Sequence, residues 1–164
     1  MTTFYDVPAG LLLPEVASTL SSDHSIELPE WAVSVKTGIH RENPPVSAEW
    51  WQTRAAAILR KVAMNGPIGV NHLAQSYGGK VDRGAQPNRA KSGSRKIVRS
   101  ILQQLEDAGL VEKVLHRIIE DAEGEKMDLY KGRKVTGAGH KILDSAARSV
   151  KESADTSFPG LNKY

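Results

Sequence analysis

"RKIVRSILQQLEDAGLVEKVLHRIIEDAEGEKMDLYKGRKVT", residues 95–136, contains a helical pattern followed by two strand patterns. Ser92 or Ser94 can cap the helix, and Gly109 ends it. "LVEKVLHRIIED" and "KMDLYKGRKV" are typical of two strands that the acidic turn "DAEGE" joins. The segment therefore predicts a helix followed by a hairpin wing, residues 110–135, with an acidic tip.

The predicted helix of this segment has one apolar side and one polar side. The apolar stripe consists of Ile97, Val98, Ile101, Leu105 and Ala108. The opposite side consists of Arg95, Lys96, Arg99 and Gln103. We expect the first set to be core and the second to be exposed.

Four helical patterns precede this segment. The first lies between Asp6 and Leu20, where Pro14 requires either a start near Leu13 or a kink. A short helix is expected between Pro29 and Gly38, and another over residues 70–77. The clearest, residues 48–65, is expected to take Ser47 as its cap and to end at "NGP".

The helix predicted over 48–65 also has two sides. At 100° per residue, the face expected in the core is Trp51, Ala55, Ile58, Leu59 and Val62. The other face holds no acid and consists of Trp50, Thr53, Arg54, Ala57, Arg60, Lys61 and Met64. Such a face suits nucleic acid, because cations neutralise phosphates and an indole can stack on a base. The alternative for Trp50 is that it packs under a terminal helix.

Thr136 is expected to begin a last helix over 137–153, with an extended tail after it. The last three helices before the hairpin, the hairpin itself and the final helix follow the order of a winged helix-turn-helix. We therefore predict a mainly α, winged-helix-like helical domain with a β-hairpin wing, as one domain over residues 1–164.

Positive charge is concentrated in one segment. Residues 80–99 hold one acid, Asp82, and seven cations: Lys80, Arg83, Arg89, Lys91, Arg95, Lys96 and Arg99. The rest of the chain has 15 cations and 18 acids. Residues 78–93 are rich in Gly, Pro, Asn and Ser, so we expect a flexible basic loop that leads into the following helix. Such a zone attracts polyanions, nucleic acid above all; a merely solvated loop is the alternative.

Other chemistries find little support in the sequence. The chain has 164 residues and no cysteine, which excludes disulfides and thiolate zinc sites and favours a reducing compartment. The five histidines share no metal spacing, the acids of the wing do not match a calcium loop, and "GGK" lacks the spacing of a nucleotide loop. No apolar run is long enough to span a membrane. We predict no enzymatic activity, no metal and no cofactor.

Several segments resemble, in order, those of the ribosomal protein S19e family of archaea and eukaryotes. They are "PEWAVSVKTGIHRENPP", "EWWQTRAAAILRKV", "GPIGVNHLAQSYGGKVDRG", "IVRSILQQLEDAGLVEK" and "GRKVTGAGHKILD". The "YDVP" start and the "KY" end are similar to the archaeal branch. The resemblance implies a cytoplasmic ribosomal protein that binds small-subunit ribosomal RNA and supports maturation of the subunit. Its implied partners are neighbouring ribosomal proteins and assembly factors, and no membrane association is implied.

The resemblance also implies an RNA-facing surface around the helix at 48–64. On the matching positions it selects Trp50, Arg54, Arg60 and Arg99, and in the basic loop Lys80 and Arg83. The charge pattern adds Lys61, Arg89, Lys91, Arg95 and Lys96 as RNA-binding candidates. The long wing departs from the family, and its acidic tip is expected to point to solvent or protein because phosphate would repel it.

A winged-helix transcription regulator that binds DNA is the alternative function. Against it, such motifs join their two helices by a turn of three or four residues, whereas "GGKVDRGAQPNRAKSG" intervenes here. A protein–protein adaptor that uses the wing is a further possible role.

Overall fold

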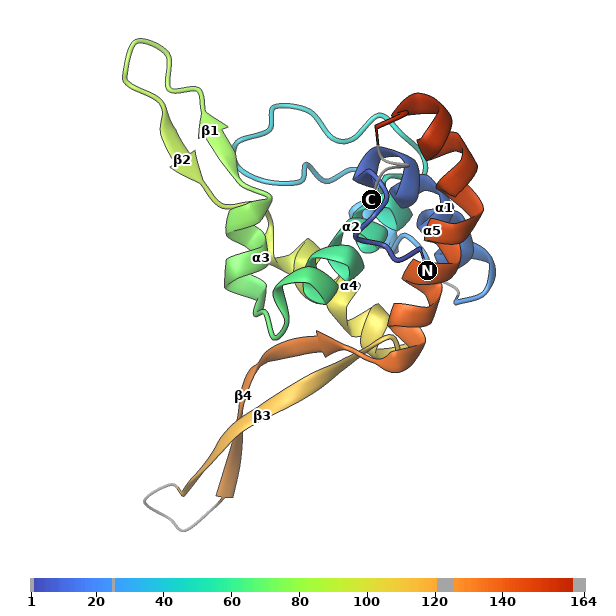
Figure 1. The fold of residues 1–164 in the computed structure, drawn as a ribbon. Helices are drawn as coiled ribbons and strands as arrows, with labels where there is room; N and C mark the ends of the chain where they lie inside the picture. The colour runs from blue at the N-terminus through green and yellow to red at the C-terminus, as the bar shows by residue number, and fades with distance from the viewer. Residues whose placement is uncertain (1, 25, 121–125, 161–164) are drawn as a thin grey trace.

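Figure 1 shows a helical body from which two β-hairpins extend. The structure, a computed structural model, describes residues 2–24, 26–120 and 126–160. In chain order the elements are α1 (Ala9–Ser22), the 3-10 helix η1 (Glu30–Ala32), α2 (Trp50–Asn65), α3 (Val70–Ser76), β1 (Gly79–Val81), β2 (Arg89–Lys91), α4 (Arg95–Asp107), β3 (Val111–Glu120), β4 (Lys126–Val135) and α5 (Gly137–Ser157). The predicted mainly α, winged-helix-like fold with a β-hairpin wing is confirmed.

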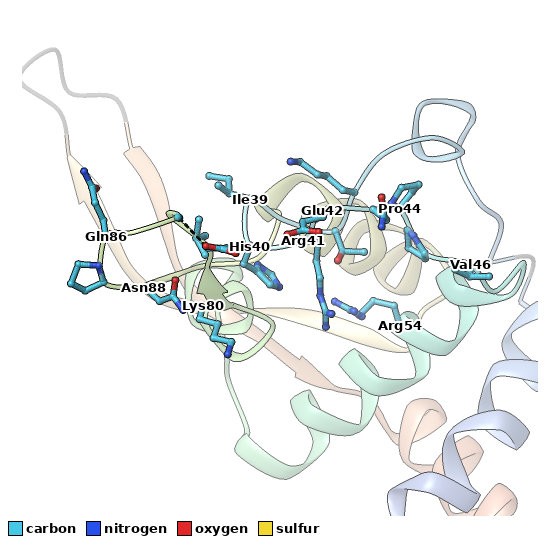
Figure 2. Close-up of a pocket in the computed structure, with 18 residues that line it drawn as sticks. Ile39, His40, Arg41, Glu42, Pro44, Val46, Arg54, Lys80, Gln86 and Asn88 are labelled. Carbon is cyan, nitrogen blue, oxygen red and sulfur yellow. Dashed lines mark hydrogen bonds between the residues drawn. The ribbon is translucent and has the colours of Figure 1, made fainter.

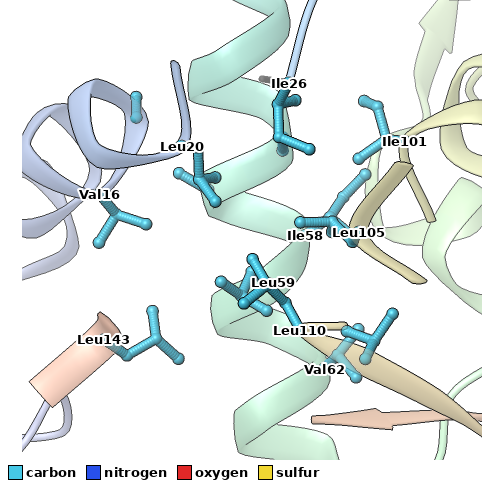
Figure 3. Close-up of a cluster of buried hydrophobic side chains, with 14 of the residues drawn as sticks. Val16, Leu20, Ile26, Ile58, Leu59, Val62, Ile101, Leu105, Leu110 and Leu143 are labelled. Carbon is cyan, nitrogen blue, oxygen red and sulfur yellow. The ribbon is translucent and has the colours of Figure 1, made fainter. Parts of the chain in front are cut away.

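Helix α2 lies in the centre of the core, with side chains of α1, α4 and α5 around it (Figure 3). Its predicted core face is fully buried, namely Trp51, Ala55, Ile58, Leu59 and Val62. The indole Nε1 of Trp51 donates a hydrogen bond of 2.8 Å to Gln104, whose side-chain amide donates to the carbonyl of Glu27. This relay fixes α2 and α4 to the segment that precedes η1.

Helix α1 begins at Ala9 and runs through Pro14, so the first of the two alternatives, a start near Leu13, is wrong. A proline inside a helix lacks one backbone hydrogen bond and costs about 3 kcal/mol. Burial of Leu12, Val16 and Leu20 in the core offsets that cost, because each fully buried aliphatic side chain contributes about 1.5–3 kcal/mol.

The start and the end of α4 follow the sequence closely. Ser94, one of the two predicted caps, accepts a hydrogen bond from the amide of Ile97. Gly109 ends the helix with a φ of 71°, and the amide of Leu110 returns to the carbonyl of Leu105. The Thr136 hydroxyl, which caps α5, donates to the carbonyl of Gly109 at 2.8 Å, so the two helix ends are joined.

Strands β3 and β4 form the predicted wing, whose acidic tip lies outside the described residues. The base of the wing docks on the segment before α3, where Ile68 and Arg133 exchange two backbone hydrogen bonds of 3.0 and 3.1 Å. The carboxylate of Glu106 on α4 pairs with Lys113 on β3 at 2.9 Å and with Arg133 on β4 at 3.0 Å. The wing is thus anchored on two sides of its base.

Four local predictions differ from the structure. Glu49, not Ser47, stands before the first turn of α2, which begins at Trp50. The short helix after Pro29 is a single 3-10 turn. Helix α5 continues to Ser157, because Ala154 is buried and extends its contact with the core. The basic loop at 78–93 contains a β-ribbon, β1–β2, that pairs Gly79 with Lys91.

Candidate nucleic-acid interface

Two cations of α2 share one aromatic ring. The guanidinium carbon of Arg54 lies 4.2 Å from the centroid of the Tyr77 ring, and the Lys61 ammonium lies 4.7 Å from it. Arg54 and Lys61 are about two turns apart on α2, so they lie on one stripe of the helix, and Tyr77 follows α3. The contact between α2 and α3 therefore places two positive charges side by side.

The Tyr77 ring leaves those charges uncompensated. Burial raises the pKa of the Tyr77 phenol to about 12, against the influence of Arg54, so the phenol is neutral at physiological pH. Burial also lowers the pKa of Arg54; Tyr77 opposes this shift and the nearby Arg41 adds to it. A guanidinium remains protonated even so. The cluster attracts an anion, because a ring quadrupole stabilises cations without cancelling their charge.

A groove of about 1050 Å³ lies beside this cluster, between the 36–46 loop and the ribbon β1–β2. Figure 2 shows the side chains of Arg41 and Arg54 pointing toward one another inside it, with Lys80 on the ribbon side. Arg41 was missed by sequence reasoning, because it stands alone in a proline-rich linker. The tertiary fold brings Arg41 close to Arg54, and a contact between such distant segments produces no periodic pattern in the sequence.

The ribbon β1–β2 divides its cations between two faces. Lys80 pairs with Ala90, while Gly79 pairs with Lys91 and Val81 with Arg89. Since paired residues share a face and successive residues alternate, Lys80 lies on one face and Arg89 and Lys91 on the other. Lys80, Arg89 and Lys91 are all exposed. The ribbon presents positive charge on both sides.

At the tip of the ribbon, Arg83 is held by its own turn. Its guanidinium donates to the side chain of Gln86 and to the carbonyl of Pro87 at 3.3 Å. The carboxylate of Asp82 accepts from the amide of Gly84, whose φ is 65°. The guanidinium of Arg83 is therefore partly engaged within the turn, which leaves fewer of its donors for an external phosphate.

The ribbon is fixed to the body at its base. The amide of Gly93 donates to the carbonyl of Ala74 at 2.8 Å, and that of Ser94 to Thr37 at 2.9 Å. The ring of His40 lies against Gly38 and Gly79, where any side chain would come within 2.9 Å of the imidazole. The segment predicted as a flexible arm thus leaves the body with a defined direction.

The cations of α4 lie at its exposed N-terminal end. Arg95 and Arg99 are exposed, as predicted, and the Lys96 ammonium lies 4.1 Å from the ring of Trp31. Trp31 packs edge-on against the buried Trp51 with ring centroids 5.9 Å apart. These contacts connect Lys96 to the aromatic core and not to the cluster around Tyr77.

Four RNA-binding candidates of the α2 outer face are half-buried and so less accessible than predicted: Trp50, Arg54, Arg60 and Lys61. Trp50 is half-buried and packs edge-on against Trp51, with ring centroids 5.2 Å apart, so only part of its indole is open to a base. Arg60 is also half-buried, and its Nε makes no hydrogen bond with the described residues. Partial burial limits the accessibility of these side chains.

The cations of the wing and the predicted RNA-binding cations differ in whether they form ion pairs. Within residues 2–24, 26–120 and 126–160, every Lys or Arg that pairs with a carboxylate belongs to the wing: Lys113, Lys126, Arg133 and Lys134. The predicted RNA-binding cations form no ion pair there. We call the surface made by α2, the 36–46 loop, the ribbon and the start of α4 the basic face. Glu42 and Asp82 also line its groove, but among the residues that the structure describes neither forms an ion pair with the cations there, so these cations are available to an external polyanion.

The described residues offer little to other chemistries. Among them, no three His, Asp or Glu side chains come together as metal ligands. No helix in the described part of the chain has the length and apolarity to cross a membrane.

Known proteins and one family model are similar to this chain over nearly its whole length. A family model described as ribosomal protein S19e matches residues 3–153. The small ribosomal subunit protein eS19 of Haloarcula marismortui is 40% identical over 168 residues, which cover 100% of this chain and 99% of the relative. The protein of the same name from Thermoplasma acidophilum is 37% identical, over 96% and 95% of the two chains. The eS19B protein of Schizosaccharomyces pombe is 33% identical, over 92% and 95%.

Proposed function

This chain belongs to the ribosomal protein S19e family, and we propose that it binds small-subunit ribosomal RNA through its basic face and thereby supports maturation of the subunit. Relatives from three archaea, including Aeropyrum pernix, match at 37–40% identity over nearly the whole chain, so the protein is of the archaeal type. A ribosomal protein of this family is a structural component of the small subunit and not an enzyme, and it resides in the cytoplasm on the ribosome.

One observation supports the proposed RNA contact most strongly. The Arg54 and Lys61 charges converge on the Tyr77 ring beside a groove that Arg41 and Lys80 also line. Folded RNA presents closely spaced phosphates, and bringing cations against them releases condensed counterions. We infer that the groove receives the RNA backbone, so recognition depends mainly on shape and phosphate position and only slightly on base identity.

The ribbon β1–β2 extends this contact. Its cations lie on both faces, so it can enter a cleft of folded RNA and meet phosphates on either side. Lys80 lines the groove, whereas Arg89 and Lys91 lie on the other face of the ribbon and would contact phosphates there. Arg95 and Arg99 at the start of α4 add a second zone of phosphate contact, with Lys96 in the same turn of the helix, and Trp50 offers the open part of its indole to a base.

A DNA-binding regulator is less well supported. The helices that would form its motif are separated by residues 77–94, which contain the whole ribbon, in place of a short turn. The aromatic-cation cluster also belongs to α2 and not to α4, the helix that such a motif would place in a major groove. Family membership likewise favours the ribosome.

The RNA contact can be tested with purified protein and a small-subunit ribosomal RNA transcript in a filter-binding titration at several salt concentrations. Arg54→Glu is expected to weaken binding by about 1.5–3 kcal/mol, because hydrogen bonds to charged groups have that magnitude. The slope of affinity against salt should fall by about one for each phosphate that the variant no longer neutralises. Arg148→Glu, an equal charge change at an exposed position of α5, is the control. Equal losses of affinity in both variants would contradict a localised RNA face.

The role in maturation has its own test. Cells depleted of the protein should accumulate unprocessed small-subunit ribosomal RNA, and the wild-type gene should restore processing. An Arg54→Glu gene should not, although the variant protein stays folded because Arg54 lies outside the core. Rescue by that variant would separate maturation from the basic face. Assembly factors that act at this step are expected to bind only precursors that contain the protein.

A further inference from the structure

The outer half of the wing, defined here as residues 115–120 and 126–130, carries an unusual amount of exposed apolar surface. It projects away from the helical body (Figure 1). Six of its side chains are large, apolar and 39–59% exposed: Leu115, Ile118, Ile119, Met127, Leu129 and Tyr130. Single exposed apolar residues are ordinary, but a cluster of this size on a small projection is typical of a contact surface.

The apolar side chains lie on both faces of the outer wing. Ile119 pairs with Met127, and Leu129 lies two residues further along the same strand, so these three share one face. On the other face, Ile118 pairs with Asp128, two residues before Tyr130. A partner that covered only one face would leave the other in water.

The edges of the outer wing are open as well. Strands β3 and β4 form a two-stranded sheet, and the pairing of Ile68 with Arg133 adds a third segment only at the base. Among the described residues, no strand pairs with the outer edges of 115–120 or 126–130. Each edge therefore presents backbone amides and carbonyls that an added strand can pair with.

Charge disfavours RNA as the occupant and favours a basic protein. The outer wing itself holds two acids and two cations, and the sequence of the tip, residues 121–125, adds three acids and no cation, so residues 115–130 together carry a net charge of −3. Within the described part, Lys126 pairs with Glu120 at 3.6 Å, so its charge is compensated in place. An apolar surface next to an acidic segment is unfavourable for phosphate but complements a protein segment that combines Lys or Arg with apolar residues.

We propose that an extended, basic segment of a neighbouring protein of the small subunit adds to the outer wing as a third β-strand. An added strand sends alternate side chains to the two faces, so one segment covers the apolar residues on both sides. The inference rests on the chain's place in the small subunit but not on the basic face. It gives the wing a function that is separate from RNA binding.

The test uses the absence of cysteine from the chain. Single variants Met127→Cys and Ile118→Cys receive a benzophenone thiol label on one face each, and Ser145→Cys on α5 is the labelled control. Each protein is added to small subunits from cells that lack it, sedimented, irradiated and analysed by mass spectrometry. We expect the Met127 and Ile118 labels to link to one and the same Lys- and Arg-containing segment of one subunit protein, and the control not to.

A companion variant, Met127→Thr with Leu129→Thr, keeps residues that favour strands but removes apolar surface. It should reduce the Ile118 link to the control yield while the protein still sediments with the subunit. Links from the two faces to different proteins, to ribosomal RNA, to a second copy of this chain, or to nothing would overturn the proposal. Failure of the wild-type protein to sediment with the subunit would instead overturn the proposed function.

Discussion

The Arg54 guanidinium lies 4.2 Å from the centre of the Tyr77 ring, and this contact joins α2 to the end of α3 at the edge of the groove. It orients the guanidinium without neutralising it, since an aromatic ring offers a quadrupole and not a charge. A carboxylate in the place of Tyr77 would hold Arg54 equally well but would compete with phosphate. The ring is therefore a suitable support for an anion-binding arginine.

Replacement of Tyr77 separates the role of the ring from that of its hydroxyl. Tyr77→Leu should weaken RNA binding, because it removes cation–π interactions of about 0.5–1 kcal/mol each that orient Arg54 and Lys61. Tyr77→Phe should bind RNA like the wild type, since the ring remains. Filter binding with the same transcript measures both. Equal weakening by the two substitutions would show that the hydroxyl, and not the ring, supports the site.

The ionisation of Tyr77 should make stability and phenolate absorbance depend on pH in a characteristic way. Its pKa in the folded protein is about 12, against an ordinary value of 10.0, because burial disfavours the phenolate. Stability linked to this group is complete below pH 10 and is lost as pH rises from about 10 through 12. A titration followed by phenolate absorbance should show one late tyrosine that Tyr77→Phe removes. An unchanged titration in that variant would place the late tyrosine elsewhere.

Arg41 should affect binding and stability in opposite directions. Its charge lies near Arg54 and disfavours the charged form of that guanidinium. Arg41→Gln removes this repulsion, so the free energy of unfolding should stay equal or rise by about 0.5 kcal/mol. RNA affinity should fall, because the groove loses a cation. Urea denaturation and filter binding on one preparation measure both quantities, and a loss of stability without a loss of affinity would contradict the placement of Arg41.

Periodicity in the sequence is informative for features that depend on near neighbours in the chain. The buried face of α2, the Ser94 cap and the Gly109 stop were predictable, since each depends on neighbours a few positions away. The ribbon β1–β2 was not, because "GKV" and "RAK" lack alternation of apolar and polar residues and the ribbon depends on its base contacts. Tyr77 and Arg41 join the site only through packing between distant segments, which single-sequence patterns do not capture.

Glu106 should control the acid stability of the wing anchor. Burial raises its pKa, but hydrogen bonds from Lys113 and Arg133 outweigh this, and the net pKa lies below the ordinary 4.5. The stabilisation that ionised Glu106 provides is therefore fully present above pH 4.5. It is lost as the pH falls through the lower pKa that Glu106 has in the folded protein. Glu106→Gln should cost about 1–2 kcal/mol at neutral pH and weaken the acid dependence of urea denaturation. Glu112→Gln breaks a more exposed pair with Lys134 and should cost less than about 0.5 kcal/mol.

Gly132 should be the most sensitive glycine of the wing. Its φ is 143°, and a Cβ there would lie 2.6 Å from the carbonyl carbon and oxygen of Ile68. Gly132→Ala must therefore strain β4 and displace the backbone on which the wing docks, at a cost of about 1–3 kcal/mol or more in the free energy of unfolding. Gly10→Ala, in open space within α1, is the matched control and should stabilise by about 0.5–1 kcal/mol. Urea denaturation compares the two, and RNA affinity should be unchanged in both because neither residue adjoins the basic face. If Gly132→Ala were as stable as the wild type, the wing could not be docked on Ile68 as closely as the structure shows.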